Sequence, residues 1–239
     1  MSNETAFKDK MTKEWEQILT INYILENASD GNEDNRSIWK NPYENFKGVF
    51  GREFDGKTIS DLNIDTKIDI YGLPVSDLKP LQKFNKIKEL YIGCTNVKEL
   101  DDIFYHTELE KLCCYNTPIQ KINSLENLTK LKILCISKTN IENISSLSKL
   151  SELRKISLYK TKIKDLSPLR NLRNLEKVNF NFTRVSSLEP LYNLRKLKEV
   201  HCFSTNVSEQ EVNKLKKILP KCKVYKEYEE PEGNYDDFA

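Results

Sequence analysis

Cysteine and histidine are the residue types in this chain best suited to nucleophilic or metal chemistry, and they are few. The 239 residues include six cysteines and two histidines. Cys113 and Cys135 are expected to be neighbours on one face, but two soft ligands without a histidine or a second cysteine pair make a poor zinc site. His106 and His201 have no acid partner or nucleophile fixed beside them. The sequence therefore predicts no metal, no cofactor and no enzymatic activity.

The cysteines also bear on the compartment. They lack paired framework spacing, and adjacent Cys113 and Cys114 cannot easily bridge each other, so the thiols are typical of a reducing compartment. The first residues, MSNETAFKDKMTKEWEQ, contain no apolar signal region. No apolar run approaches the roughly 18 residues of a membrane helix. We therefore expect a cytoplasmic protein without a membrane segment. No glycine lies between Gly93 and Gly233, which disfavours glycine-rich phosphate loops there.

A short sequence repeat organises the chain. Threonine recurs at a constant spacing, at Thr95, Thr117, Thr139, Thr161, Thr183 and Thr205. Apolar residues recur in register with it, and one unit reads LxxLxLxxTxIxxLxxLxxLxx. Before each threonine comes an apolar-x-apolar pair, such as Leu134 and Ile136.

These spacings predict an α/β solenoid. The L-x-L pair alternates with period two, as in a short strand buried on one face. The other apolar residues fall every three positions, which favours a tight helical or 3₁₀ return. Because no unit can bury its apolar side alone, neighbouring units must stack into one continuous core. We expect each threonine hydroxyl to satisfy turn backbone groups in adjacent coils.

The array resembles the leucine-rich repeat family, in the 22-residue class of bacterial internalins and of the phosphatase-regulator type. The resemblance covers about residues 66–225, with a degenerate first unit that has Leu73 at the threonine position. The family more often has Asn where this chain has Thr. The resemblance implies short parallel strands on a concave face, helical or 3₁₀ returns, and a scaffold that binds proteins without catalysis.

Four regions are expected along the chain. Residues 1–65 form an N-terminal helical and aromatic cap, or alternatively a small interaction subdomain. Residues 66–207 form the solenoid, and residues 208–225 a C-terminal cap. In that cap, Ser208 and Glu211 form a capping box that begins a helix through about Leu219. Residues 226–239 form an acidic tail, expected to be disordered.

The outward positions of the strands are the candidate binding residues. Recurring aromatics flanked by lysines are typical of binding hot spots, although tyrosine also suits strands by β-propensity and lateral packing. His106 takes a normally apolar position and is expected to be a partly buried structural imidazole or a local irregularity. The predicted partner-binding residues on the concave face are Tyr71, Tyr91, Lys111, Tyr115, Lys155, Tyr159, Lys177, Asn181, His201 and Phe203.

Charge is distributed unevenly. Residues 79–225 carry 28 Lys and Arg against 15 Asp and Glu, a net charge of +13, between acidic ends of −6 and −5. The lysines either cover a solvated convex surface or attract an acidic partner or the chain's own tail.

Three functions follow from these observations. We favour a monomeric, non-enzymatic module that binds a protein partner. The alternative is polyanion or nucleic-acid binding, but Lys outnumbers Arg 23 to 5 in the array and no nucleic-acid motif is present. A third possibility is enzymatic activity in residues 1–65, which contain neither His nor Cys.

Overall fold

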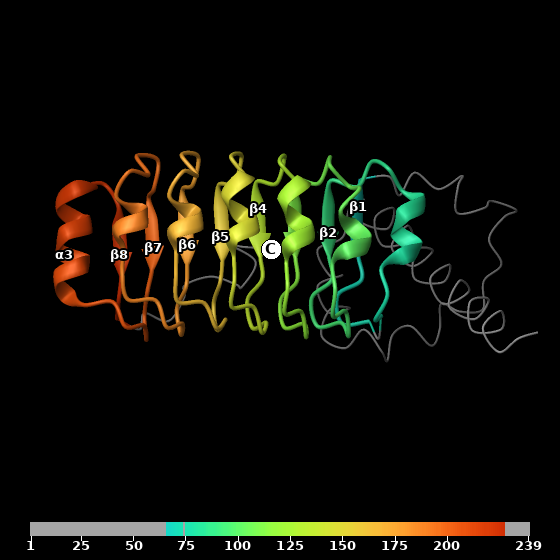
Figure 1. Cartoon of the computed structure of the whole chain (residues 1–239), viewed down its shortest axis with the longest axis horizontal. Helices are drawn as coiled ribbons and strands as arrows, with labels where there is room; N and C mark the ends of the chain where they lie inside the picture. The colour runs from blue at the N-terminus through green and yellow to red at the C-terminus, as the bar shows by residue number, and fades with distance from the viewer. Residues whose placement is uncertain (1–65, 74, 228–239) are drawn as a thin grey trace, which may run out of the picture.

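A computed structural model of the chain describes residues 66–73 and 75–227 (Figure 1). The predicted N-terminal cap, its alternative as an interaction subdomain, and residues 228–239 of the acidic tail lie outside this part. Within it, one sheet holds eight parallel strands in sequence order. The strands are β1 (Lys67–Asp69), β2 (Glu89–Tyr91), β3 (Lys111–Cys113), β4 (Ile133–Cys135), β5 (Lys155–Ser157), β6 (Lys177–Asn179), β7 (Glu199–His201) and β8 (Lys223–Tyr225). The predicted α/β solenoid is confirmed.

The returns between strands are 3₁₀ turns, which lie in front of the strands in Figure 1. In one return, the amides of Leu147, Leu150 and Leu153 each donate to the carbonyl three residues earlier, at 3.0 Å. A period of three places these leucines on one side of a 3₁₀ turn, so all three are buried. The turns are η4 (Lys79–Lys83), η5 (Asp101–Ile103), η6 (Asn123–Asn127), η7 (Ser145–Lys149), η8 (Ser167–Leu169) and η9 (Glu189–Leu191).

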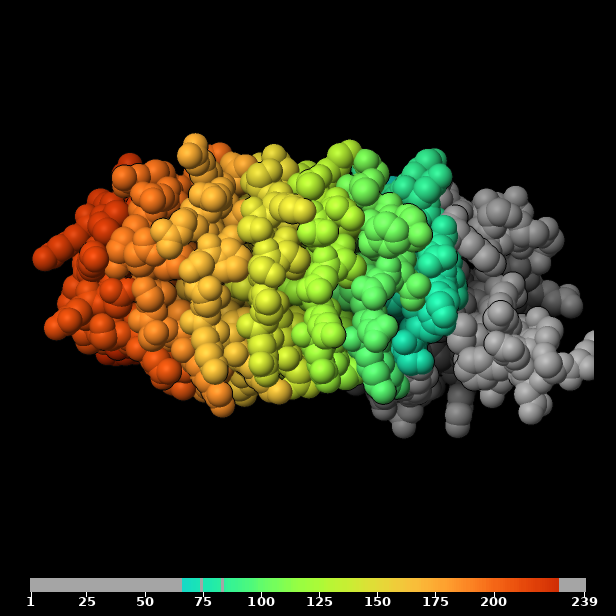
Figure 2. Space-filling model, in the orientation of Figure 1, coloured from blue at the N-terminus to red at the C-terminus, as the bar shows by residue number. Residues whose placement is uncertain are grey.

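Strand pairing stacks equivalent residues of successive repeats. From β1 to β7, each strand residue pairs with the equivalent residue of the next repeat, as Leu112 does with Leu134 and Leu134 with Ile156. The stacked apolar columns form a single core cluster from Ile68 to Cys222. Figure 2 shows the repeats as successive bands in contact along the whole array.

The repeated threonines act within their own coil. Thr139 Oγ1 donates to the carbonyl of Ile136 at 2.7 Å, and the five other threonines bond the carbonyl three residues before them in the same way. The predicted contact with adjacent coils is therefore wrong. A threonine that bonds the carbonyl three residues back closes its own turn, whereas backbone amides of the strand ends already join neighbouring coils.

The residue before each threonine has a left-handed backbone conformation. Six such residues are not glycine: Cys94, Asn116, Lys138, Lys160, Phe182 and Ser204, with φ between 52° and 57°. This conformation costs about 1–2 kcal/mol for a residue with a Cβ. The chain therefore turns sharply at the same place in each of these six repeats. In each one, the left-handed residue follows the strand and directly precedes the threonine.

A helix covers the C-terminal end of the core. Helix α3 (Glu209–Ile218) buries Val212 and Leu215, and Ser208 Oγ accepts the Glu211 amide at 3.2 Å. The C-terminal helix is thus confirmed, but the capping box is only half formed. The Glu211 carboxylate instead accepts the Leu188 amide at 2.7 Å and fastens the helix to the preceding repeat.

Inserting α3 also changes the register of the last strand pair. Glu199 lies opposite Lys223, and not opposite Lys221, where the spacing of the earlier repeats would put its partner. None of the helices in residues 66–73 and 75–227 is long and apolar enough to cross a membrane.

His106 is a polar side chain in an apolar column. Its equivalents in the other repeats are Phe84, Leu128, Leu150, Leu172 and Leu194, all buried. His106 is 2% exposed, and its Nε2 atom has no hydrogen-bond partner. Burial lowers the pKa of the imidazole, although a backbone hydrogen bond with Phe84 opposes this. Of the two interpretations made from the sequence, the structural imidazole is the one observed, but it is fully and not partly buried.

We predict that His106→Leu stabilises the protein by roughly 1–2 kcal/mol near neutral pH, because it removes an unsatisfied buried polar atom. The difference in stability between His106→Leu and wild type should grow as the pH falls. The folded-state pKa lies below the unfolded value of about 6.5, so the unfolded chain takes up the proton first and the wild type loses stability below that pH. Urea unfolding at pH 8 and pH 5 measures both effects, with His201→Gln as the control for the other histidine. Equal pH dependence in His106→Leu and wild type would contradict this.

We further predict that Thr139→Val lowers the free energy of unfolding by about 1–2 kcal/mol, because the Ile136 carbonyl loses its side-chain donor while the shape is kept. Thr129→Val, at an exposed position, is the matched control and should change stability by less than about 0.5 kcal/mol. Urea unfolding of both variants checks this, and equal effects would show that the buried hydrogen bond contributes nothing.

Candidate protein-binding surface

The face of the sheet opposite the 3₁₀ turns carries the outward strand residues, and we refer to it as the strand face. Alternation along each strand decides which side chains reach it. Leu112 and Cys114 belong to the core cluster, whereas Lys111, Cys113 and Tyr115 do not. All ten residues predicted as partner-binding occupy such outward positions, at or next to the strands.

Tyr91 is the centre of a group at the N-terminal end of the strand face. The Lys67 and Lys111 ammonium groups lie 5.5 and 5.0 Å from its ring centroid, within cation–π range. Its hydroxyl donates to Glu89 at 2.8 Å. Burial, together with this hydrogen bond, raises the Tyr91 pKa, so the phenol remains a neutral donor.

Tyr71 lies next to this group and depends on a glycine. A Cβ at Gly93 would come within 2.6 Å of the Tyr71 ring, so a larger residue at position 93 would displace the ring from this place. The Cys94 thiol donates to the Tyr71 hydroxyl at 3.1 Å. Even so, Tyr71 stays 43% exposed. Tyr115, two repeats after Tyr71, lies under Lys138, whose ammonium is 4.9 Å from the ring centroid.

Three aromatic rings meet near the C-terminal end of the strand face. Phe182 lies edge-on to Tyr159 and to Phe203, with centroids 5.4 and 5.2 Å apart. We refer to these three rings as the aromatic row. The Lys160 ammonium lies 5.3 Å from the Tyr159 centroid and 5.0 Å from that of Phe182. Edge-to-face contacts hold the rings in fixed orientations before any partner binds.

A charged group borders the aromatic row. Glu199 accepts Lys177 Nζ at 3.1 Å and lies 3.3 Å from His201 Nε2. The His201 ring is stacked on Tyr225, with centroids 4.5 Å apart. Burial raises the pKa of Glu199, but the hydrogen bonds from Lys177 and His201 outweigh it, so the pKa lies below its usual value.

Two of the predicted residues have other surroundings. Asn181 accepts the Phe203 amide at 2.7 Å through its side-chain oxygen, so this amide group positions the backbone of the next repeat. Lys155 is half-buried in β5, between the register positions of Ile133 and Lys177. The ten residues thus divide into an N-terminal group and a C-terminal group, with Lys155 between them.

Small residues separate the two aromatic groups. Cys113, Cys135, Ser137 and Ser157 point to the strand face, yet they are only 2–6% exposed. Cys113, Cys135 and Ser157 belong to one outward column and Ser137 to the next, and none of the four is among the predicted partner-binding residues. The Ser137 and Ser157 hydroxyls lie 2.7 Å apart and share a hydrogen bond.

One column of the strand face was missed by reasoning from the strand pattern alone. Lys138, Lys160 and Phe182 reach this face from the left-handed position just before each threonine. The repeat spacing holds there too, but nothing in the alternation of apolar residues indicates that the backbone reverses its handedness. Phe182 links Tyr159 to Phe203, which otherwise stand two repeats apart.

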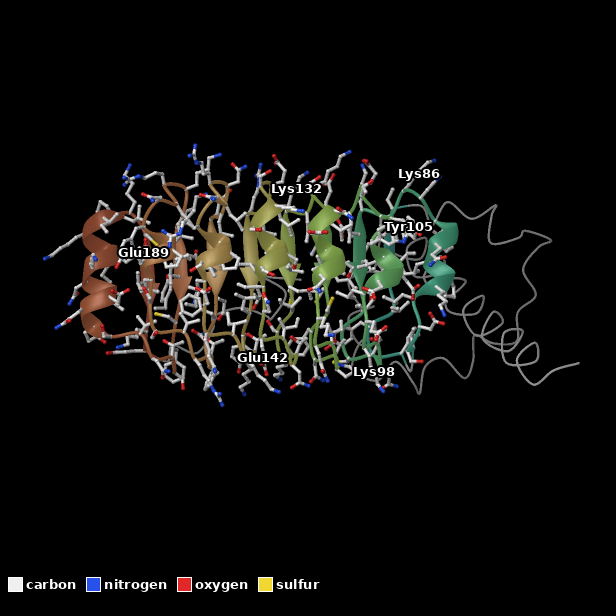
Figure 3. All side chains as sticks on the ribbon, in the orientation of Figure 1. Lys86, Lys98, Tyr105, Lys132, Glu142 and Glu189 are labelled. Carbon is white, nitrogen blue, oxygen red and sulfur yellow. The ribbon has the colours of Figure 1, made fainter. Side chains whose placement is uncertain are left out.

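Aromatic residues are also exposed on the opposite side of the array. Phe104 and Tyr105, beside η5, are 37% and 64% exposed, and their ring centroids lie 3.6 Å apart. Figure 3 labels Tyr105 on the side of the turns. This pair has no third ring stacked on it in the described ranges, unlike the aromatic row.

Ion pairs between repeats neutralise part of the basic array. Lys130 pairs with Glu108 and Lys132 with Glu110, both at 2.6 Å and both between equivalent positions of adjacent repeats. Figure 3 places Lys132 and Lys86 along one edge of the array, and Lys98 and Glu142 along the opposite edge. Such exposed pairs add little stability, but they leave fewer glutamates to offset the remaining lysines.

A metal site with three or more protein ligands is not indicated in the described part of the chain. No three His, Cys, Asp or Glu side chains come together as possible metal ligands within residues 66–73 and 75–227.

Comparison with known proteins agrees with this geometry. The family model for leucine-rich repeats (two copies) matches residues 129–171 and 151–193, which include β4 to β6. The chain is a leucine-rich repeat protein. No curated protein matches its sequence.

Solved structures share the fold of this leucine-rich repeat protein. Internalin C2 of Listeria monocytogenes superposes with a TM-score of 0.67 and 23% identity over 74% of this chain and 78% of that one. An internalin (inlF) of the same organism gives a TM-score of 0.57 and 19% identity over 76% and 66% of the two chains. A leucine-rich repeat protein of Leptospira interrogans gives 0.57 and 20% over 60% of this chain and 38% of its own. The predicted likeness to internalins is confirmed at the level of structure.

We predict that Lys177→Met in this leucine-rich repeat protein raises the pKa of Glu199, because the carboxylate loses the nearer of its two hydrogen-bond partners, the Lys177 ammonium. Lys198→Met should leave Glu199 unchanged and raise the pKa of Glu176, which a hydrogen bond from Lys198 lowers. Carboxyl carbon NMR shifts followed against pH measure both residues in both variants. A rise at both carboxylates in both variants would instead mean that long-range charge, and not these contacts, sets the two pKa values.

Proposed function

We propose that the protein is a non-enzymatic recognition module that binds a protein partner through the strand face. Leucine-rich repeat arrays are generally interaction scaffolds and not catalysts. The choice of the strand face rests mainly on the aromatic row. Tyr159, Phe182 and Phe203 are preoriented rings beside a lysine, a combination that provides contact area at little cost in conformational entropy.

The neighbouring groups suggest the chemistry of the partner. Lys160 above the aromatic row and Lys138 above Tyr115 place positive charge beside apolar surface. A complementary partner would therefore present apolar or aromatic side chains flanked by carboxylates. We further propose that the protein acts as a monomer in the cytoplasm, as expected from its composition and cysteine spacing.

The proposal is tested by comparing two matched sets of aromatic substitutions. In the strand-face variant, Tyr159, Phe182 and Phe203 are all changed to Ala. In the return-side variant, the exposed Phe104 and Tyr105 are changed to Ala. We expect the strand-face variant to lose at least about 100-fold in affinity, since a single hot-spot residue contributes about 2 kcal/mol or more. The return-side variant should bind as the wild type does.

The measurement is affinity purification from an extract of the native organism with the full chain as bait, followed by titration of the captured protein against each variant. Thermal unfolding verifies that both variants fold. A captured protein that binds the strand-face variant as tightly as wild type, or that loses affinity for the return-side variant, would refute the proposed surface.

Polyanion binding is the second candidate, supported by the net charge of +13 over residues 79–225. It predicts binding to random-sequence DNA or RNA at about 50 mM salt that falls steeply as salt rises, because each phosphate contact releases counterions. Absence of binding at that salt concentration would eliminate this candidate and leave the protein-binding proposal unaffected.

A further inference from the structure

Two cysteine side chains lie next to each other in the middle of the strand face. Cys113 ends β3 and Cys135 ends β4, and the two residues are paired directly in the parallel register. Neighbouring strands lie about 4.8 Å apart, which falls within the range of about 4.4–6.8 Å for the Cα atoms of a disulfide. Cys113 is near enough to act as the main influence that lowers the pKa of the Cys135 thiol. The register thus places the two thiols side by side before any reaction.

The other cysteines are differently placed. Cys114 is next to Cys113 in sequence, but it points into the core with Cys202 and Cys222. Burial raises the pKa of all three of these thiols. Cys94 is directed at the Tyr71 hydroxyl. Of the six cysteines, Cys113 and Cys135 are thus the pair in which strand register brings two thiols together.

We propose that Cys113 and Cys135 are an oxidation site that reacts with a small hydroperoxide to form a reversible disulfide. The proposal goes beyond binding, and it holds whether or not the strand face binds a protein. The size of the oxidant follows from burial, since Cys113 is 3% and Cys135 6% exposed. Hydrogen peroxide can reach such sulfur atoms through small fluctuations, whereas a bulky disulfide reagent has no access without opening the sheet.

Cys135 is the residue that attacks first. Its thiolate is stabilised by the hydrogen bond from Cys113, then by the Ser137 amide and hydroxyl and by the charge of Lys111. These contacts outweigh burial and hold the pKa of Cys135 below its usual value. The Ser137 hydroxyl oxygen lies 3.6 Å from Cys135 Sγ. A thiolate, and not a thiol, is the nucleophile toward peroxide.

The reaction takes two steps. The Cys135 thiolate attacks one peroxide oxygen, the O–O bond breaks, and the departing hydroxide takes a proton to become water, which leaves a sulfenic acid. Cys113 sulfur then attacks the sulfenic sulfur, the S–O bond breaks, and the leaving hydroxide takes the Cys113 proton as a second water. Two thiols are oxidised by two electrons, and one hydrogen peroxide is reduced to two water molecules.

The resulting bond should be easily reduced. Side chains at paired positions of parallel strands extend side by side, so their Cβ atoms are about as far apart as the strands, beyond the usual disulfide spacing of about 3.8 Å. Closing this gap strains the sheet, and strained disulfides are the labile ones. A thiol reductant such as dithiothreitol or glutathione should therefore restore both thiols.

The test uses the reduced full chain treated with equimolar hydrogen peroxide, alkylated, digested with trypsin and analysed by mass spectrometry without reduction. We expect peptides 112–121 and 133–138 to appear joined, with the loss of two hydrogens, and to separate again if dithiothreitol is added before alkylation. Because peptide 112–121 contains both Cys113 and Cys114, the variants Cys114→Ala and Cys113→Ser assign the bond. The link should persist in Cys114→Ala and in Cys94→Ser, and be absent from Cys113→Ser and Cys135→Ser.

Three results would overturn the proposal. Peptides 112–121 and 133–138 that stay separately alkylated after peroxide treatment would show that no bond forms. A link that persists in Cys113→Ser would assign the reaction to Cys114. A link found only in a covalent dimer on a non-reducing gel would place the bond between molecules. Circular dichroism of every variant before oxidation verifies that the sheet is intact.

Discussion

Parallel pairing at a constant offset of one repeat is the constraint on which the whole array depends. Each short strand is unstable alone, and its backbone groups and apolar side chains are satisfied only by the same groups of the next repeat. Residues at equivalent positions therefore stack in columns across the sheet. A residue of another type, such as His106 in a column of Leu and Phe, is a local packing defect. Its neighbours in that column cannot adjust, because the same pairing fixes their positions.

The same stacking separates structural columns from surface columns. Columns that face the core admit little besides Leu, Ile, Val and Cys, whereas the strand face carries tyrosine, lysine, cysteine and serine at equivalent positions. Where large rings fall in neighbouring repeats, as at Phe182 and Phe203, they pack on each other and form an oriented apolar surface. Where small side chains fall together, as at Cys113 and Cys135, they are covered by their neighbours, so a surface position becomes a buried pair of thiols. The same outward column thus holds the Tyr91 ring in one repeat and the Cys113 thiol in the next.

The fold of residues 66–73 and 75–227 could be predicted almost completely because it follows from spacing alone. Period two and period three within one short repeat unit leave few other ways to bury the leucines, and the C-terminal helix was indicated by Ser208 and Glu211. Polar contacts were predicted less well. The threonine hydroxyls close their own turns and do not join coils, and the Glu211 carboxylate fastens α3 to the Leu188 amide and does not complete a capping box. A hydroxyl or carboxylate has several backbone partners within reach, and only the coordinates of the turn decide between them.

The sequence by itself determined the repeat, the core columns, the order of the strands and the basic character of the array, because each depends only on residue type and spacing along the chain. The tertiary structure decided which outward residues are exposed, which rings touch, and which thiols are neighbours. Those properties depend on left-handed residues such as Phe182 and on the volumes of side chains one repeat away, at Gly93 beside Tyr71 for example. Burial and contact on the strand face are set by lateral neighbours from adjacent repeats, and only the folded array brings these neighbours together.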